Sequence, residues 1–266
     1  MRVALMAPTS LLEHVQPLSK YHLVLAYKVI YDHKYQEYCR LRSKAGDYII
    51  LDNGAVERGG RSMPMRDIVL AAILTKPALV VLPDFLFDSH KTLNELENAL
   101  RSPGMRFLKR VHSEVKLCTI VQGLDERDWL ECFSILNDPR NGIDVLGIPK
   151  ITGQIFGSRL EALKRIRRKV KKPCHLFGVW WKSTLDELRQ ESEFDFVQGL
   201  DTPKPVRLAV HGMGLDRWSE MPRGKDFLDR SHNGVDLDLV RRNCEQFIEI
   251  CNGGVQCLRK VNSSTP

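Results

Sequence analysis

The sequence predicts an α/β fold, a single (β/α)8 barrel of the TIM type with an insertion after the eighth strand. Along its 266 residues, short runs rich in β-forming residues alternate with segments of helical periodicity, the pattern of successive βα units around a parallel sheet. The β-rich runs are almost continuously apolar, as expected for strands that are buried on both faces. Eight such runs are present, which is the number that closes a barrel.

Helical patterns separate most of the predicted strands. The helix after the third strand is expected to begin near Pro64, because Ser62 can cap it and proline is tolerated in a first turn. Other helices are expected at about 33–43, 89–101, 125–136, 159–170, 184–190 and 236–251. The expected strands are Val3–Met6, His22–Tyr27, Tyr48–Leu51, Leu79–Leu82, Leu117–Val121, Val145–Ile148, His175–Val179 and Phe194–Leu200.

The length of the chain fits one large barrel or two small domains, and 43% hydrophobic residues are enough for a full core. We expect a single catalytic barrel over residues 1–260. Residues 202–235 interrupt the βα rhythm, are rich in Gly, Pro, Arg and Asp, and exceed a typical βα connection, so we interpret them as a functional insertion. Residues 261–266 are polar and are expected to form a flexible tail.

The composition bears on location and partners. No run of about 18 apolar residues is present, so no transmembrane helix is expected, and the apolar start of the chain is too short for a signal peptide. The seven cysteines are scattered and odd in number, which favours reduced, buried thiols in a cytoplasmic protein. The net charge of +7 is compatible with a polyanionic partner without proving one.

Polar residues recur where the predicted strands end. Asp52, Asp84 and Asp201 end or follow the third, fourth and eighth strands, and Gln122 with Gly123 follows the fifth. Each aspartate alone is better explained as a helix cap or turn former. Because the carboxyl ends of the strands converge at one mouth of a barrel, the set together predicts a site there.

Two carboxylates that face one substrate suit a glycosyl transfer. One attacks the anomeric carbon and the other moves the proton of the leaving group. No Walker motif and no G-x-G-x-x-G motif follows a strand, which disfavours ATP-driven and redox chemistry.

The ordered set of strand ends resembles the tRNA-guanine transglycosylase superfamily. The sequence is most similar to the short phage and bacterial branch called DpdA, the DNA-guanine transglycosylases that place 7-deazaguanine bases in DNA. The likeness runs from about Val3 to Pro205. Its landmarks are Leu51-Asp52-Asn53-Gly54-Ala55, Val81-Leu82-Pro83-Asp84, Ile120-Val121-Gln122-Gly123, Leu146-Gly147-Ile148-Pro149, His175-Leu176-Phe177-Gly178 and Asp201-Thr202.

The resemblance implies a role for each matched residue. Asp201 becomes the nucleophile on C1′ of the sugar, and Asp52 becomes the acid/base group for the leaving and entering bases. Asp84 would accept hydrogen bonds from N1–H and the exocyclic amine of guanine. The remaining substrate-binding residues implied at the carbonyl edge and the pocket wall are Gln122, Gly123, Gly147, Ile148, Phe177 and Gly178.

The sequence departs from the tRNA enzymes in two places. Those enzymes carry a Cys-x-Cys-x-x-Cys zinc motif and a later histidine, whereas Cys244, Cys251 and Cys257 are spaced seven and six residues apart, so zinc is possible but not favoured and no cofactor is expected. Lys150 follows the sixth-strand landmark where the family has a glutamate that accommodates a cationic base. If Lys150 faces the pocket, a neutral base such as 7-cyano-7-deazaguanine fits better.

Basic residues near the strand ends are candidate phosphate ligands, namely Arg58, Arg61, Lys182, Lys204 and Arg207. The segment Arg159–Lys172 holds eight basic residues and is either a solvated outer helix or a further phosphate contact. Trp180 or Trp181 could stack on a base, and rim packing is the alternative role.

The sequence thus predicts a DNA-guanine transglycosylase with DNA and a free 7-deazaguanine base as partners and no membrane contact. Three alternatives stay open: the same exchange on tRNA, a base-excising N-glycosidase in which water replaces the incoming base, and a non-catalytic DNA-binding barrel.

Overall fold

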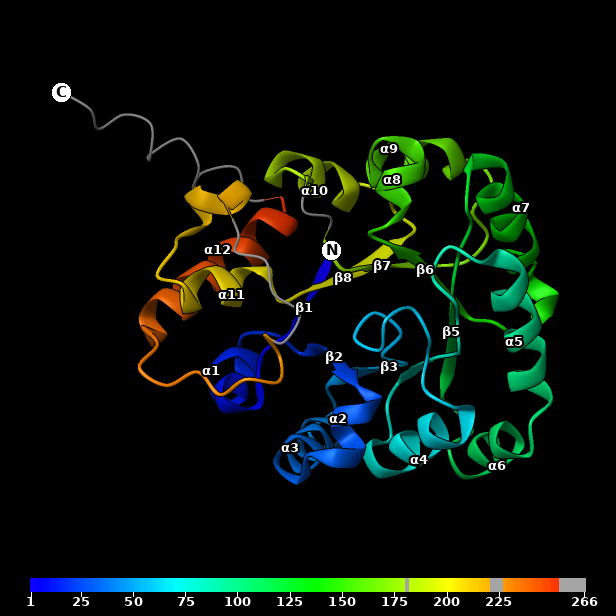
Figure 1. The fold of residues 1–266 in the computed structure, drawn as a ribbon, viewed down its shortest axis with the longest axis horizontal. Helices are drawn as coiled ribbons and strands as arrows, with labels where there is room; N and C mark the ends of the chain where they lie inside the picture. Colours follow the sequence, from blue (N-terminus) through cyan, green and yellow to red (C-terminus); the bar gives the residue numbers. More distant parts are fainter. Residues whose placement is uncertain (180–181, 221–226, 254–266) are drawn as a thin grey trace.

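Eight parallel strands form the centre of the molecule and helices surround them (Figure 1). The structure is a computed structural model that describes residues 1–179, 182–220 and 227–253. The strands follow the order β1-β8-β7-β6-β5-β4-β3-β2, so each chain neighbour is also a neighbour in space. Their bounds are Arg2–Leu5 (β1), Tyr21–Leu25 (β2), Tyr48–Asp52 (β3), Leu79–Val81 (β4), Lys116–Ile120 (β5), Val145–Pro149 (β6), Cys174–Phe177 (β7) and Val197–Thr202 (β8).

The first and second strands lie side by side and complete a nearly closed barrel. Side chains from the turn between them bond the carbonyls on the edge of β1. Ser19 donates from Oγ to the carbonyl of Val3 over 2.7 Å, and Gln16 donates from Nε2 to that of Leu5 over 3.0 Å. These bonds satisfy an edge that would otherwise be unpaired. The predicted (β/α)8 barrel is confirmed.

The helices form the outer layer, and they bury one face against the strands. The longer ones are His33–Lys44 (α3), Met65–Thr75 (α4), Ser89–Arg101 (α5), Pro103–Val111 (α6), Glu126–Leu136 (α7), Arg159–Ile166 (α9), Leu185–Ser192 (α10) and Leu237–Cys251 (α12). The shorter ones are Thr9–Leu11 (η1), Leu12–Val15 (α1), Gln16–Leu18 (η2), Ala26–Tyr31 (α2), Pro139–Asn141 (η3), Thr152–Phe156 (α8), Lys204–Val210 (α11) and Leu215–Glu220 (η4).

Three local predictions were wrong. The second strand was expected to continue to Tyr27, but it ends at Leu25 and α2 begins at Ala26, because Ala26 and Val29 are buried in the helical conformation. The helix α6 was missed, although Ser102 caps it by accepting from the Met105 N–H over 3.1 Å. The eighth strand starts and ends later than expected, so Asp201 lies inside it.

Of the predicted insertion 202–235, the structure describes residues 202–220 and 227–235, and its helices α11 and η4 pack beside the last helix, α12. From α12, Asn243 donates from Nδ2 to the carbonyls of Pro205 and Met213 over 3.2 and 2.9 Å. The predicted tail 261–266 lies outside the described residues. Within the described ranges, no helix combines the length and the apolar character that crossing a lipid bilayer requires.

Candidate active site

A cavity of about 170 Å³ opens at the carboxyl ends of the strands, which is room for several water molecules. This is the mouth at which βα loops of such barrels converge. Most of the residues predicted for the site line it. They are Asp52, Asp84, Gln122, Phe177, Gly178, Asp201, Lys204 and Arg207, and Lys150 lines it as well.

The two oxygens of the Asp201 carboxylate have different surroundings. Oδ1 accepts from His175 Nε2 over 3.1 Å and from the Gly178 N–H over 3.1 Å. Oδ2 has no hydrogen-bond partner among the described residues, and it is not sealed from the cavity. Asp201 therefore has one anchored oxygen and one oxygen that can meet a substrate.

A buried tyrosine and histidine stand behind Asp201. Tyr21 Oη lies 2.9 Å from His175 Nδ1, and both residues are buried inside the barrel. Burial raises the pKa of the Tyr21 hydroxyl, so it keeps its proton. An ionised carboxylate only accepts, so the contact with Asp201 requires a proton on His175 Nε2. No role was predicted for either residue.

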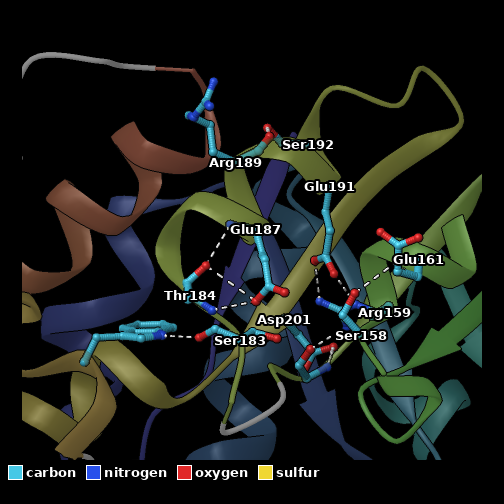
Figure 2. A network of polar contacts seen from close by, with 12 residues as sticks. Ser158, Arg159, Glu161, Ser183, Thr184, Glu187, Arg189, Glu191, Ser192 and Asp201 are labelled. Atoms are coloured by element: carbon cyan, nitrogen blue, oxygen red, sulfur yellow. Dashed lines mark hydrogen bonds and ion pairs between the residues drawn. The ribbon is translucent and has the colours of Figure 1, made fainter. Parts of the chain in front are cut away.

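Both backbone polar groups of Gly178 are hydrogen-bonded, one to Asp201 and the other to Arg159, the two side chains labelled in Figure 2. Its N–H donates to Asp201, and its carbonyl accepts from Arg159 Nη1 over 2.7 Å. Arg159 is also paired with Glu191 over 2.8 Å, and each of these side chains is 1% exposed. The pair thus braces the loop that touches Asp201.

This burial corrects the interpretation of Arg159–Lys172 as one uniformly solvated or phosphate-binding face. Arg159 belongs to the brace, and Lys172 is buried with its Nζ donating to the carbonyl of Leu136 over 2.9 Å. Arg167, Arg168, Lys169 and Lys171 do remain exposed.

Asp84 lies at the buried floor of the cavity. Asn53 Nδ2 donates to Oδ1 over 2.7 Å, and Gln122 Nε2 donates to Oδ2 over 2.6 Å. Burial raises the pKa of Asp84 to about 6, against the lowering effect of these bonds. Gln122 is itself held, since its Oε1 accepts from the Phe87 N–H over 3.1 Å. One of its amide protons is thus committed to Asp84, and the other can reach a ligand.

Asp52 is the last residue of β3, and its Oδ2 accepts from the Gly54 N–H over 2.9 Å. Burial, together with the neighbouring carboxylates of Glu57, Asp201 and Asp84, raises the pKa of Asp52 well above its ordinary range. Asp52 is thus suited to carry a proton. Glu57 lines the cavity at its exposed rim and was missed, although it follows Asp52 by only five residues.

Three predicted substrate ligands lie behind the cavity wall. Ile148 is fully buried, and a Cβ on Gly147 would lie 2.8 Å from the Phe177 ring, which covers that glycine. A Cβ on Gly123 would lie 2.5 Å from the backbone of Trp129. The lack of a side chain at Gly123 therefore lets α7 pack close to the sheet. The structure therefore does not bring Gly123, Gly147 and Ile148 to the site.

In comparisons with known proteins, no protein-family model and no curated protein matches the chain.

The predicted phosphate ligands fall into two groups. Arg58, Arg61 and Lys182 are exposed on loops, and Arg207 is half-buried at the cavity wall. Lys204 is only 2% exposed, and its Nζ lies 3.7 Å from the centre of the Trp218 ring, with no hydrogen-bond partner among the described residues. Burial lowers the pKa of Lys204 to about 8. Lys204 is therefore not on the surface as predicted.

Two further groups of predicted residues have limited structural descriptions. Cys244 and Cys251 are buried on α12, and Cys257 lies outside the described residues. Across residues 1–179, 182–220 and 227–253, no group of three His, Cys, Asp or Glu side chains is placed to hold a metal ion. Trp180 and Trp181 lie outside the described ranges.

Proposed function

We propose that this protein is a DNA-guanine transglycosylase that exchanges guanine for a 7-deazaguanine base, such as 7-cyano-7-deazaguanine. The observation that supports this most is the unequal state of two carboxylates that line one cavity. Asp52 has a raised pKa and suits an acid, whereas Asp201 is anchored through Oδ1 and has Oδ2 open to the cavity. Such a division of roles is what a double displacement at a sugar carbon needs.

In the first step, Asp201 Oδ2 attacks C1′ and the bond from C1′ to the guanine nitrogen breaks. Asp52 gives its proton to the departing guanine, and a sugar–Asp201 ester remains. In the second step, the nitrogen of the incoming base attacks C1′ and the ester bond breaks. The proton of the incoming base passes to Asp52, which restores both carboxyl groups with net retention at C1′. One glycosidic bond replaces another, so the exchange balances without a cofactor.

The floor of the cavity suits a guanine-like base. Above a pH of about 6, Asp84 is ionised and offers an acceptor to the ring N–H and exocyclic amine of guanine. The free amide proton of Gln122 can donate to the base carbonyl. Phe177 supplies an apolar wall for the base plane. A guanine in a duplex has to leave the stack to enter, at a cost of a few kcal/mol.

The test is transfer of an isotopically labelled 7-deazaguanine base into DNA or tRNA by the purified protein. We expect label in DNA, with loss for Asp201→Asn and retention for Asp125→Asn, a cap of α7 that asparagine can replace. Label in tRNA alone would support the same chemistry on RNA. Abasic sites without label would indicate an N-glycosidase. DNA binding with neither product would indicate a non-catalytic barrel.

A further inference from the structure

The buried Tyr21–His175 pair adds a second layer to the site. We propose that His175 is a positioning residue that donates from Nε2 to Asp201 and is held in place at Nδ1 by Tyr21, so that only Oδ2 of Asp201 faces the substrate. This inference rests on the proposed function for the role of Asp201 as nucleophile. The placement of His175 itself rests on the contacts alone.

The first step of the argument is the selection of one oxygen. His175 Nε2 and the Gly178 N–H both point at Oδ1, so the carboxylate cannot turn about its own axis without losing two bonds to its charge. The donors come from β7 and from the residue that follows it, whereas Asp201 lies on β8. A rigid pair of neighbouring strands therefore sets the direction of attack.

The second step is the choice of tautomer. If His175 carried its proton on Nδ1 instead, the lone pair of Nε2 would face an oxygen of Asp201 without a proton between them. Asp201 opposes that state, because an ionised carboxylate can only accept, and with the proton on Nε2 the Tyr21 hydroxyl can donate to Nδ1 over 2.9 Å. The pair is therefore a one-way chain of donors that runs from Tyr21 through His175 to Asp201.

The third step is the rigidity of Tyr21. Its ring stacks on Tyr48 with centroids 5.2 Å apart, and the Arg2 guanidinium lies 4.6 Å from its centre. A Cβ on Gly199 would lie 2.5 Å from the ring, so glycine is what leaves space for the tyrosine on the adjoining part of β8. The donor chain is thus packed in place before a substrate arrives.

The hydrogen bonds from His175 and Gly178 to Oδ1 also act when Asp201 leaves the sugar in the second step of the reaction. The carboxylate charge is lost when the ester forms and returns when the ester opens. Preorganised donors at Oδ1 stabilise that returning charge without rearrangement. Since His175 touches Asp201 and not the base, its removal should lower kcat and leave the KM for the free base nearly unchanged.

The experiment compares His175→Phe, which removes both hydrogen-bonding groups, with His175→Gln, whose amide keeps one donor and one acceptor. We expect kcat for labelled-base exchange to fall by roughly 10- to 100-fold in His175→Phe and to recover to within about fivefold in His175→Gln. The double variant Tyr21→Phe/His175→Phe removes the orphaned hydroxyl, so it covers the case in which the single variant folds poorly.

The matched control is His22→Phe. His22 is an equally buried histidine that pairs with an aspartate, Asp47, over 2.8 Å, and it does not line the cavity. This variant should lower the melting temperature while the folded fraction keeps its kcat. The inference fails if His175→Phe keeps kcat within threefold of the unmodified protein. It also fails if His175→Gln loses as much kcat as His175→Phe.

A second readout separates this inference from the proposed function. The ¹⁵N chemical shifts of His175 in the resting protein should report a proton on Nε2, and Tyr21→Phe should change the shift of Nδ1, which loses its hydroxyl partner, while the proton stays on Nε2. A ring protonated on Nδ1 overturns the inference whether or not the protein exchanges bases. If no base is exchanged by the unmodified protein, the proposed function fails, and the tautomer alone decides the positioning of Asp201.

Discussion

Gln122 Nε2 lies 2.6 Å from Oδ2 of Asp84, so a side chain that follows β5 holds a carboxylate that follows β4. Asn53, which follows β3, holds the other oxygen over 2.7 Å. Three successive strand ends thus build one polar floor from groups far apart in the sequence. The carboxylate at its centre is buried, hydrogen-bonded and still ionisable, which gives it a measurable dependence on pH.

The first prediction concerns the stability supplied by Asp84. Its pKa is raised from 3.8 to about 6 in the folded protein, so the folded state holds this proton more tightly than the unfolded state. The stabilisation is therefore complete below about pH 4 and is lost as the pH rises through about 6. A shift of roughly two pKa units corresponds to about 3 kcal/mol.

Urea unfolding of the unmodified protein and of Asp84→Asn measures this effect. Between about pH 4 and pH 7, the unfolding free energy of the unmodified protein should fall by about 2 to 3 kcal/mol relative to that of Asp84→Asn. A difference that stays constant with pH would show that Asp84 titrates as it does in the unfolded chain.

The second prediction concerns proton transfer by Asp52. Asp52→Asn should lower base exchange by about 100-fold or more, since asparagine cannot supply or take up a proton. Affinity for DNA should stay within about threefold, because no phosphate contact is removed. Glu57→Gln at the rim is the control, and its loss should be much smaller. Equal losses in the two variants would move the acid/base role to Glu57.

The third prediction concerns the support of the Phe177 wall. Gly147→Ala places a Cβ within 2.9 Å of both the Phe177 ring and the Ile120 side chain, so the ring has to move. We expect a loss of about 1 to 3 kcal/mol in unfolding free energy and a higher KM for the free base. Gly104→Ala on α6 meets Val69 at 3.3 Å and should have little effect on either. A KM unchanged in Gly147→Ala would exclude Phe177 from the base pocket.

The fourth prediction concerns Lys204. Its Nζ is buried against Trp218 and has no hydrogen-bond partner in the part of the chain that the structure describes. Lys204→Met should therefore leave the unfolding free energy unchanged or increase it, by up to about 1 kcal/mol. The salt dependence of DNA binding should not change. Arg58→Met, at an exposed loop, should reduce the slope of log K against log salt by about one. A reduced slope in Lys204→Met would show that Lys204 contacts a DNA phosphate.

Much of the barrel could be predicted from the sequence, because strands buried on both faces leave long apolar runs and end at a common level. That regularity located Asp52, Asp84, Gln122 and Asp201 without any knowledge of the loops. A glycine at a strand end indicates a close approach to the backbone, but it does not show whether a ligand or, as at Gly147, an aromatic ring makes that approach.

The supporting residues could not be predicted, because their contacts join distant parts of the chain. Tyr21 and His175 are separated by 154 positions, and periodicity does not show which inward-facing residues meet across a barrel. The Arg159–Glu191 pair joins two helices whose sequences are typical of solvated helices. Lys204 is buried by the packing of α11, although the charge of a lysine predicts an exposed side chain.

The central claim is that Asp201 becomes covalently attached to the sugar. The most direct measurement is mass spectrometry of peptides after the protein is trapped with guanine-containing DNA in the absence of an incoming base. We predict a nucleic-acid adduct on the peptide that contains Asp201, and its absence in Asp201→Asn. An adduct on another residue, or base exchange by the unmodified protein with no adduct at all, would contradict the account.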